Sequence, residues 1–238
     1  MFDKFKALFG GDTDTEPQCR WLSAADYQNP YGIDGYDCVP YVSERFTSTA
    51  DPEIAESFVR LRETEGLEYV NQLPPEAIEL RSNLAYPIQG GVVEGSFFKA
   101  SAMEEKWDAY SYHGRLYFAR SWTGMLAYVA EFKISAIEPG AFAVAPGATS
   151  AVCVNRFWIA GGQADADEAF LVRQLDYLIK LFLFHLRVPH PLPGNLARDP
   201  DTVGAYSFNQ YGNMCWFGSY EDTLPLELLN PKCPPQVM

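Results

Sequence analysis

The residues of this sequence that could do chemistry gather around one short segment, Arg120-Ser121-Trp122-Thr123-Gly124. A guanidinium binds carboxylate and phosphate oxygens through a rigid fork of N–H donors, and it also stacks on indole rings. The hydroxyls of Ser121 and Thr123 add hydrogen-bonding groups beside it. This segment, together with Trp107, fits two interpretations. The pattern favours a structural aromatic cluster in which Arg120 pairs with a carboxylate, and the alternative is an anion clamp in the wall of a ligand pocket.

Two aromatic residues further along the chain, His190 and Trp216, are added to this candidate site because of their residue types. His190 lies between two prolines, where we expect it at the rim of a cleft. Trp216 offers a further indole on which a ligand ring can stack. The predicted ligand-binding or partner-binding residues are Trp107, Arg120, Ser121, Trp122, Thr123, His190 and Trp216.

The sequence carries no recognisable catalytic motif. It lacks the GxSxG, HExxH and P-loop patterns, and a nucleophile would need a base within reach. We expect His113 to be solvated in a tight turn and His185 to be buried within a helix. No cofactor and no metal site is expected, because the cysteines form no CxxC pair and no histidine stands at metal-ligand spacing. The catalytic residues stay unknown; the sequence favours a non-enzymatic protein and leaves enzymatic activity open.

A predicted three-stranded antiparallel meander over residues 106–132 must position this site. His113-Gly114 and Thr123-Gly124 each place Gly second in the turn, where a two-residue hairpin loop requires positive φ. Counting outward pairs Trp107 with Arg120 across the first turn, so both side chains lie on one face of the sheet. A slip of one residue would move Arg120 to the other face and remove the site.

The second turn fixes the other half of this register. It predicts that Trp122 lies opposite Met125 and that Arg120 lies opposite Ala127. Both faces are largely apolar, so we expect both to be covered. One face carries Trp107, Ala109, Leu116, Phe118, Arg120, Trp122 and Val129, and the other carries Tyr110, Tyr112, Tyr117, Leu126, Tyr128 and Phe132.

Helices are predicted on both sides of the meander. Asp51-Pro52 supplies an N-cap and a proline at the first helical position, which predicts a helix up to Gly66. Pro74-Pro75 predicts a second short helix to about Ser82. A capping pattern at Asp165 begins a long helix to about Arg187. Its second half is apolar nearly all round, so it must be buried on more than one side.

Further strands are predicted at 92–100, 141–145 and 150–160, and Gly212-Asn213 predicts a hairpin turn that sets Asn209 opposite Trp216. The predicted fold class is α+β: a single antiparallel sheet of about five or six strands packed on a long C-terminal helix, with N-terminal helices. The predicted organisation is a short amphipathic helix and acidic tether (1–17), a single α+β domain (18–230) and a loose tail (231–238).

Composition narrows the class of protein. Hydrophobic residues are 47% and charged residues 21% of the 238 positions, as in ordinary globular proteins. The formal net charge of −13 disfavours nucleic-acid binding, which needs cationic surface, and favours electrostatic steering toward a basic partner. The chain shows no signal peptide and no apolar run of roughly 20 residues, so we expect no membrane span and a cytoplasmic protein.

Five segments of the chain, NPYGIDGYDC, AESFVRLR, KWDAYSYHGRLYFARSWTG, HPLP and YSFNQYG, together resemble an uncharacterised family of bacterial cytosolic proteins. The RSWTG turn at 120–124 is the most distinctive of these pieces. The resemblance extends from about Trp21 to Tyr220, and it implies a bacterial cytosolic protein without implying any activity.

Two functions follow from these observations. The first is a non-enzymatic acidic binding protein that neutralises a basic protein partner in the manner of immunity proteins; it predicts a contiguous acidic and aromatic surface patch. The alternative is a small-molecule-binding enzyme or sensor with an Arg/Trp-lined pocket on the meander. It predicts a concave site into which Arg120 points without a carboxylate partner. The sequence favours the first and leaves the oligomeric state open.

Overall fold

A computed structural model describes residues 21–27, 29, 37–40, 49–136, 148–163, 166–186, 188–212 and 217–219. The helix predicted at 1–9, the strand predicted at 141–145, the tail at 231–238 and the predicted site residue Trp216 lie outside these ranges.

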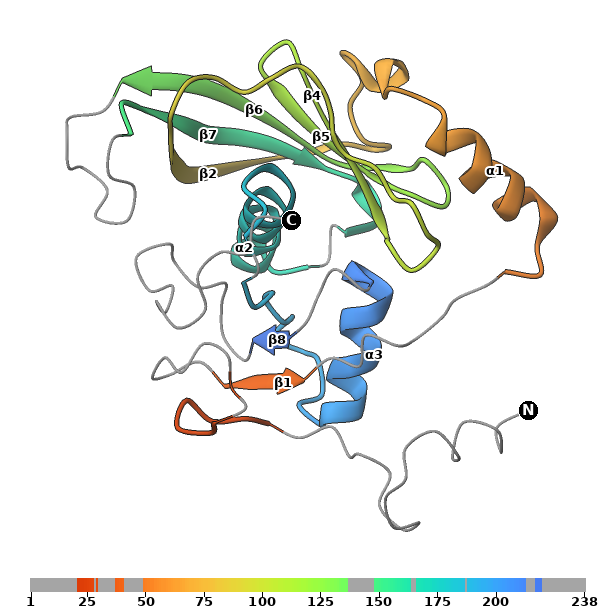
Figure 1. Ribbon diagram of the computed structural model, residues 1–238, viewed down its shortest axis with the longest axis vertical. Helices are drawn as coiled ribbons and strands as arrows, with labels where there is room; N and C mark the ends of the chain where they lie inside the picture. Colours follow the sequence, from red (N-terminus) through yellow and green to blue (C-terminus); the bar gives the residue numbers. More distant parts are fainter. Residues whose placement is uncertain are drawn as a thin grey trace.

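The described helices and strands follow one another along the chain as Figure 1 shows. They are β1 (Cys38–Pro40), α1 (Pro52–Arg62), β2 (Ile78–Ile88), β3 (Gly95–Phe98), β4 (Trp107–Tyr112), β5 (Arg115–Arg120), β6 (Leu126–Ala136), β7 (Ser150–Ile159), α2 (Glu168–Leu178), α3 (Pro200–Tyr211) and β8 (Phe217–Ser219), with short 3₁₀ turns at Leu67–Tyr69 and Gly161–Gln163 and a π-helical turn at Ile179–Leu183.

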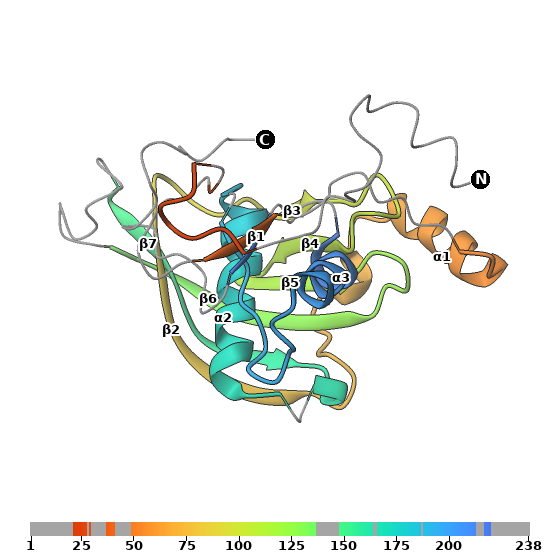
Figure 2. The same cartoon turned by 90° about the horizontal axis from the view of Figure 1, so that it is seen from below.

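The main sheet has six antiparallel strands in the order β2-β7-β6-β5-β4-β3. This confirms the predicted α+β class with one antiparallel sheet of that size. A second sheet, not predicted, pairs the short strands β1 and β8. The main sheet is strongly bent, and β2 and β7 curve around α2 (Figure 2).

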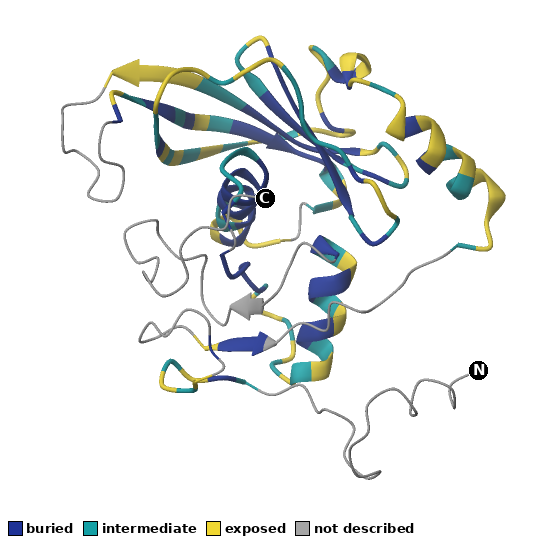
Figure 3. Ribbon diagram, in the orientation of Figure 1, coloured by how far each residue is buried: buried dark blue, intermediate teal, exposed yellow. Residues whose placement is uncertain are grey.

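Both faces of the sheet are covered, as predicted. On the α2 side the core joins Leu175 and Leu178 of the helix to Phe118 and Phe157 of the strands. On the opposite side a smaller tyrosine-rich cluster packs beneath the 3₁₀ turn at Leu67–Tyr69. Every residue of β4 is therefore buried (Figure 3).

Helix α1 begins where the sequence predicts. The Asp51 carboxylate accepts hydrogen bonds from the N–H groups of Glu53 and Ile54, and Pro52 occupies the first turn. The second predicted helix, up to Ser82, is wrong, because this segment forms β2 instead. Alternating half-buried and exposed positions let β2 cover the edge of β7, and that pairing outweighs the helix-start signal of the two prolines.

The long C-terminal helix is shorter than predicted. α2 has 11 residues and continues into a π-helical turn of 5 residues. Its N-cap is Asp167, whose side chain accepts a hydrogen bond from the N–H of Phe170. The helix ends before Arg187 because His185 takes a left-handed conformation, with φ of 53°.

The predicted hairpin around Gly212 is wrong, because Asn209 lies within helix α3. Asp199 caps this helix through a 2.8 Å hydrogen bond from the N–H of Thr202, and Pro200 follows at the first helical position. This is the same Asp-Pro signal that predicts α1 correctly, so the sequence held the information. The φ of 67° at Gly212 ends the helix.

The meander confirms one predicted turn and corrects the other. Trp107 pairs with Arg120 as predicted, around a two-residue turn in which His113 and Gly114 both have positive φ. The second turn is wider than predicted, so Arg120 does not lie opposite Ala127. The predicted register would place Val129 opposite Phe118, but Tyr128 pairs with Phe118, and a bulge follows between Phe118 and Ala119. Tyr128 therefore joins the Trp107 face and Val129 the opposite one, the reverse of the prediction.

Candidate ligand-binding site

Arg120 lies where the end of the β4–β5 hairpin meets the last turn of α3. Its guanidinium carbon is 4.7 Å from the centre of the Trp107 ring. Its terminal nitrogens donate to the carbonyls of Gln210 (2.9 Å) and Asn209 (2.8 Å). The Trp107 indole N–H donates to the same Gln210 carbonyl at 2.6 Å. The strand pair thus fixes α3, and α3 in turn fixes the guanidinium.

The guanidinium is charged and partly buried. Burial lowers the pKa of Arg120 from its usual 12.5 to about 10, an effect that the hydroxyls of Tyr211, Tyr206 and Tyr128 partly oppose. It therefore stays protonated at neutral pH. A cation beside the carbonyl end of a helix is favourable, which explains its contact with α3. In the part of the chain that the structure describes, Arg120 makes no ion pair with a carboxylate.

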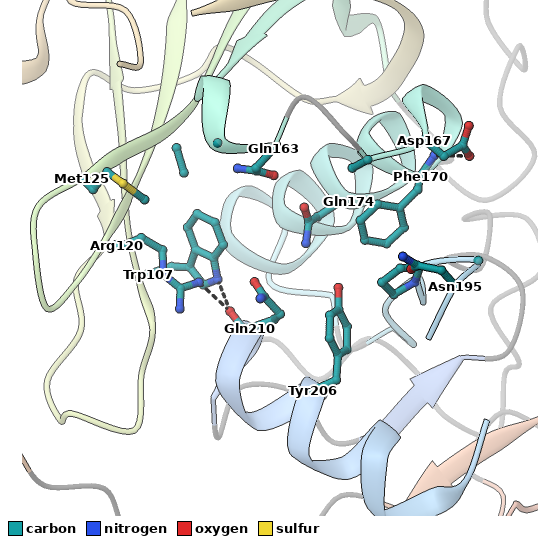
Figure 4. Close-up of a pocket in the computed structure, with 15 residues that line it drawn as sticks. Trp107, Arg120, Met125, Gln163, Asp167, Phe170, Gln174, Asn195, Tyr206 and Gln210 are labelled. Atoms are coloured by element: carbon teal, nitrogen blue, oxygen red, sulfur yellow. Dashed lines mark hydrogen bonds between the residues drawn. The ribbon is translucent and has the colours of Figure 1, made fainter. Parts of the chain in front are cut away.

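A cavity of about 730 Å³ opens beside Arg120 and Trp107, between the sheet, α2 and α3. We call it the large cavity. Figure 4 shows Arg120 and Trp107 on one side of it and Phe170, Gln174 and Tyr206 facing it from the two helices. Aromatic rings and amide groups make up much of its lining, and Asp167 at its edge is engaged in capping α2. The further amide groups of the lining belong to Gln163, Asn195 and Gln210.

A hydrogen-bonded chain of side chains connects two lining residues of the large cavity, Gln163 and Gln174, to the buried residues Tyr128 and Tyr211. The Tyr128 hydroxyl contacts the amide oxygens of Gln163, at 3.0 Å, and of Gln174. The Gln174 amide nitrogen donates to the Tyr211 hydroxyl at 2.9 Å. Because both tyrosine hydroxyls are buried, their pKa values are raised and they stay neutral. The amide groups of Gln163 and Gln174 thus line the cavity while neutral tyrosines hold them in place.

A second cavity of about 490 Å³ shares Arg120 and Met125 with the first. We call it the small cavity. Lys106, Trp122, Thr123 and Asn209 line the rest of it. Met125 is 45% exposed at the boundary of the two cavities.

The predicted site residues separate into three groups. Trp107 and Arg120 line the large cavity, and Arg120, Trp122 and Thr123 line the small one. Ser121 lines neither: it is buried, and its hydroxyl donates to the Glu105 carbonyl at 2.6 Å. Its backbone N–H also donates to the Lys106 carbonyl, at 3.2 Å, so Ser121 joins the strand end to the segment before β4.

His190 is not at a rim, contrary to the prediction, but completely buried. Its Nδ1 lies 3.0 Å from the Pro191 carbonyl and its Nε2 lies 2.7 Å from the Ser207 hydroxyl. Its ring packs against Tyr177 and Tyr211. Burial lowers the pKa of His190 from 6.5 to about 4, so it is neutral at physiological pH. A histidine and serine at this distance resemble a catalytic pair, but neither side chain reaches a cavity lining that the structure describes.

The sequence analysis did not identify the residues that the helices contribute to the site. Tyr206 and Gln210 were not recognised because their segment was predicted to end in a hairpin, whereas it forms α3. Gln174 carried a readable signal, because it is a buried polar residue on a helix face otherwise made of Phe170, Leu171 and Leu178. Lys106 carried none, since its burial depends on α3.

Fold and site together define a class: an α+β protein in which an antiparallel sheet and two helices enclose an amide-lined and aromatic cavity beside one guanidinium. No protein-family model, curated protein or solved structure matches the chain, so the resemblance to a bacterial family stays a prediction. Within the described ranges, no helix is long and apolar enough to cross a membrane. No group of three or more His, Cys, Asp or Glu side chains there is placed to hold a metal ion.

Proposed function

We propose that this protein binds a small organic anion in the large cavity, with Arg120 as the anion clamp. The observation that carries the proposal is the position of the guanidinium: it lines a cavity of about 730 Å³, stacks on Trp107, and has no carboxylate partner among the described residues. A guanidinium has five N–H donors, and the described hydrogen bonds to Asn209 and Gln210 use two of them. Donors therefore remain for a carboxylate or a phosphoryl group.

The remaining lining supports a ligand with a neutral, hydrogen-bonding body. Phe170 and Tyr206 offer ring faces for an apolar or sugar-like ring, and Gln163 and Asn195 offer amides to hydroxyl or carbonyl groups. Binding pockets commonly combine a mainly apolar wall with a few fixed polar groups of this kind. A sensor or carrier needs no more than this, whereas an enzyme would require a nucleophile or base facing the cavity.

The test is a thermal-shift screen of aromatic and sugar carboxylates and phosphate esters, followed by calorimetry on any compound that stabilises the protein. We expect Arg120→Met to weaken binding at least about tenfold, because it removes the charge-assisted hydrogen bonds. Arg115→Met is the matched control, since Arg115 lies at the other end of β5 over Trp158 and lines neither cavity. Equal weakening by both variants would contradict a specific role of Arg120.

A second variant separates the cavity from the stability of α3. Gly194 lines the large cavity, and a side chain added there would meet nothing within 4 Å. Gly194→Phe has room at its Cβ and is designed to place a bulky ring at the lining of the cavity, so we expect it to abolish binding while the melting temperature stays near that of the wild type. Unchanged binding in this variant would place the ligand elsewhere and end the proposal.

A second candidate function is the neutralisation of a basic protein partner by an acidic surface. Helix α1 supports it, because Val59 is 58% exposed and Leu67, just beyond the helix, is 64% exposed. Exposed carboxylates on and just beyond the helix outnumber the two exposed arginines there, Arg60 and Arg62, which gives this surface a net negative charge that favours cationic proteins. The carboxylates belong to Glu53, Glu56, Glu63, Glu65 and Glu68.

The test of this candidate compares the wild type with Glu53→Lys/Glu56→Lys/Glu63→Lys in association kinetics with basic proteins purified from the native host. Charge reversal should slow association several-fold at low salt and leave dissociation nearly unchanged. A matched triple reversal on other elements, at exposed Glu79, Glu168 and Asp201, changes the total charge by the same amount and serves as the control. If both sets slow association equally, α1 is not the docking surface.

A further inference from the structure

The small cavity joins two cationic side chains that are far more enclosed than surface cations. Lys106 is 7% exposed, and its ammonium lies 4.3 Å from the centre of the Trp122 ring and 4.8 Å from that of Phe208. It also donates to the Met103 carbonyl at 2.7 Å. Arg120 lines the same cavity from the neighbouring strand.

The two cations affect each other. Burial and then the positive charge of Arg120 lower the pKa of Lys106 from 10.5 to about 8, and Glu104 opposes the shift. From α3 the Phe208 ring faces the ammonium. Bringing like charges together under partial burial is costly, and an anion placed against both of them relieves that cost.

The other lining groups suit an anion as well. The Trp122 indole N–H is already bound to the Met103 carbonyl at 2.7 Å, so the ring is held in place. Thr123 and Asn209 are exposed at the mouth of the cavity and supply hydroxyl and amide donors. The described lining contains no Asp or Glu.

We propose that the small cavity is a second binding site, which takes a tetrahedral dianion such as the phosphate group of a phosphate ester between Lys106 and Arg120. The site stands apart from the function proposed for the large cavity, although Arg120 belongs to both. A ligand that reached both cavities would carry a phosphate group in addition to its first anionic group.

Sulfate is the sharpest probe, because it is a tetrahedral dianion that does not titrate near the pKa of Lys106. We expect calorimetry at about pH 8 to show sulfate binding with uptake of up to about half a proton, since a bound dianion raises the pKa of Lys106. Titrations in two buffers with different ionisation enthalpies measure that uptake. Inorganic phosphate should compete with sulfate for the site.

Lys106→Met removes the charge and keeps most of the length of the side chain. It should weaken sulfate binding at least about tenfold and abolish the proton uptake. Lys133→Met is the control, because Lys133 is exposed on β6 and lines neither cavity. Asn209→Asp guards against misfolding of the first variant, since it changes an exposed residue and repels the dianion while both cations remain.

Two results would overturn the proposal: no sulfate or phosphate binding at millimolar concentration, or binding that Lys106→Met and Asn209→Asp leave unchanged. Gly194→Phe distinguishes the two sites. It should eliminate the organic anion from the large cavity and leave sulfate binding intact, so either site can fail while the other stands.

Discussion

Arg120 performs a structural task as well as the proposed binding task. Its guanidinium donates to two carbonyls at the end of α3, and the same group lines both cavities. Such sharing suits recognition, because the helix holds the donors in place before a ligand arrives. It also means that substitutions at Arg120 change stability and binding together.

The first prediction at this scale is a loss of stability in Arg120→Lys. Lysine keeps the charge but cannot reach two carbonyls with a planar fork, so we expect a loss of about 2 kcal/mol in the free energy of unfolding. Urea unfolding measures it, with Arg115→Lys as the control on the same strand. A loss no larger than that of the control would show that the contacts with α3 contribute little.

The second prediction concerns His190 and acid. The folded protein holds its pKa at about 4, below the ordinary 6.5, so between these values the unfolded chain binds a proton that the folded chain does not. Stability is therefore lost as pH falls from 6.5 toward 4. We expect His190 to contribute a loss of about 2 kcal/mol between about pH 7 and about pH 5.

Urea unfolding of the wild type and of His190→Gln at both pH values isolates this contribution. The variant should start less stable and lose less on acidification, because glutamine does not titrate. Parallel losses in the two proteins would show that the acid sensitivity comes from other groups.

At the scale of elements, the attachment of α3 to the meander decides whether a site exists. The Gln210 carbonyl accepts from Trp107 and Arg120, and the next contact is a bridge between Glu105 and Gly212. Each of these contacts comes from the last turn of the helix. Loss of that turn would open both cavities on the α3 side.

The third prediction tests this attachment at Gly212. Its φ is 67°, and a Cβ added there would lie 1.7 Å from the Glu104 carbonyl oxygen, so the backbone must move. We expect Gly212→Ala to cost at least about 3 kcal/mol of folding stability. The matched control is Gly194→Ala, whose Cβ meets nothing within 4 Å. A variant at Gly212 as stable as this control would show that α3 is not held at that point.

At the scale of the whole molecule, one core connects the main sheet to both C-terminal helices. The main cluster of buried side chains extends from Tyr86 of β2 through the meander to Leu178 of α2 and Tyr211 of α3. A smaller cluster of Val39, Leu192 and Val203 continues it beneath α3. Shared burial of this kind couples the unfolding of the elements.

The fourth prediction is a single cooperative unfolding transition, as the proposed single domain over 18–230 requires. Far-UV circular dichroism reports the secondary structure and tryptophan fluorescence reports the surroundings of the five tryptophans, two of which lie in the meander, and the two melting curves should coincide. Separate transitions would show that α3 and the small sheet of β1 and β8 unfold apart from the main sheet.

Local sequence signals predicted correctly those elements whose geometry depends only on neighbouring residues. The positive φ of His113-Gly114 fixed the first hairpin and thereby the pairing of Trp107 with Arg120. The second turn failed because a two-residue loop at Thr123-Gly124 is only one of the turns that the segment allows. The wider turn and bulge exchange the faces of Tyr128 and Val129.

The sequence by itself determined that a guanidinium and an indole share one sheet face, because strand pairing across a tight turn is a local matter. Only the tertiary structure decided that α3 closes over them, that Lys106 is enclosed beside Arg120, and that His190 is buried away from both cavities. These placements depend on packing between segments about a hundred residues apart, such as Trp107 and Gln210, which no local pattern records.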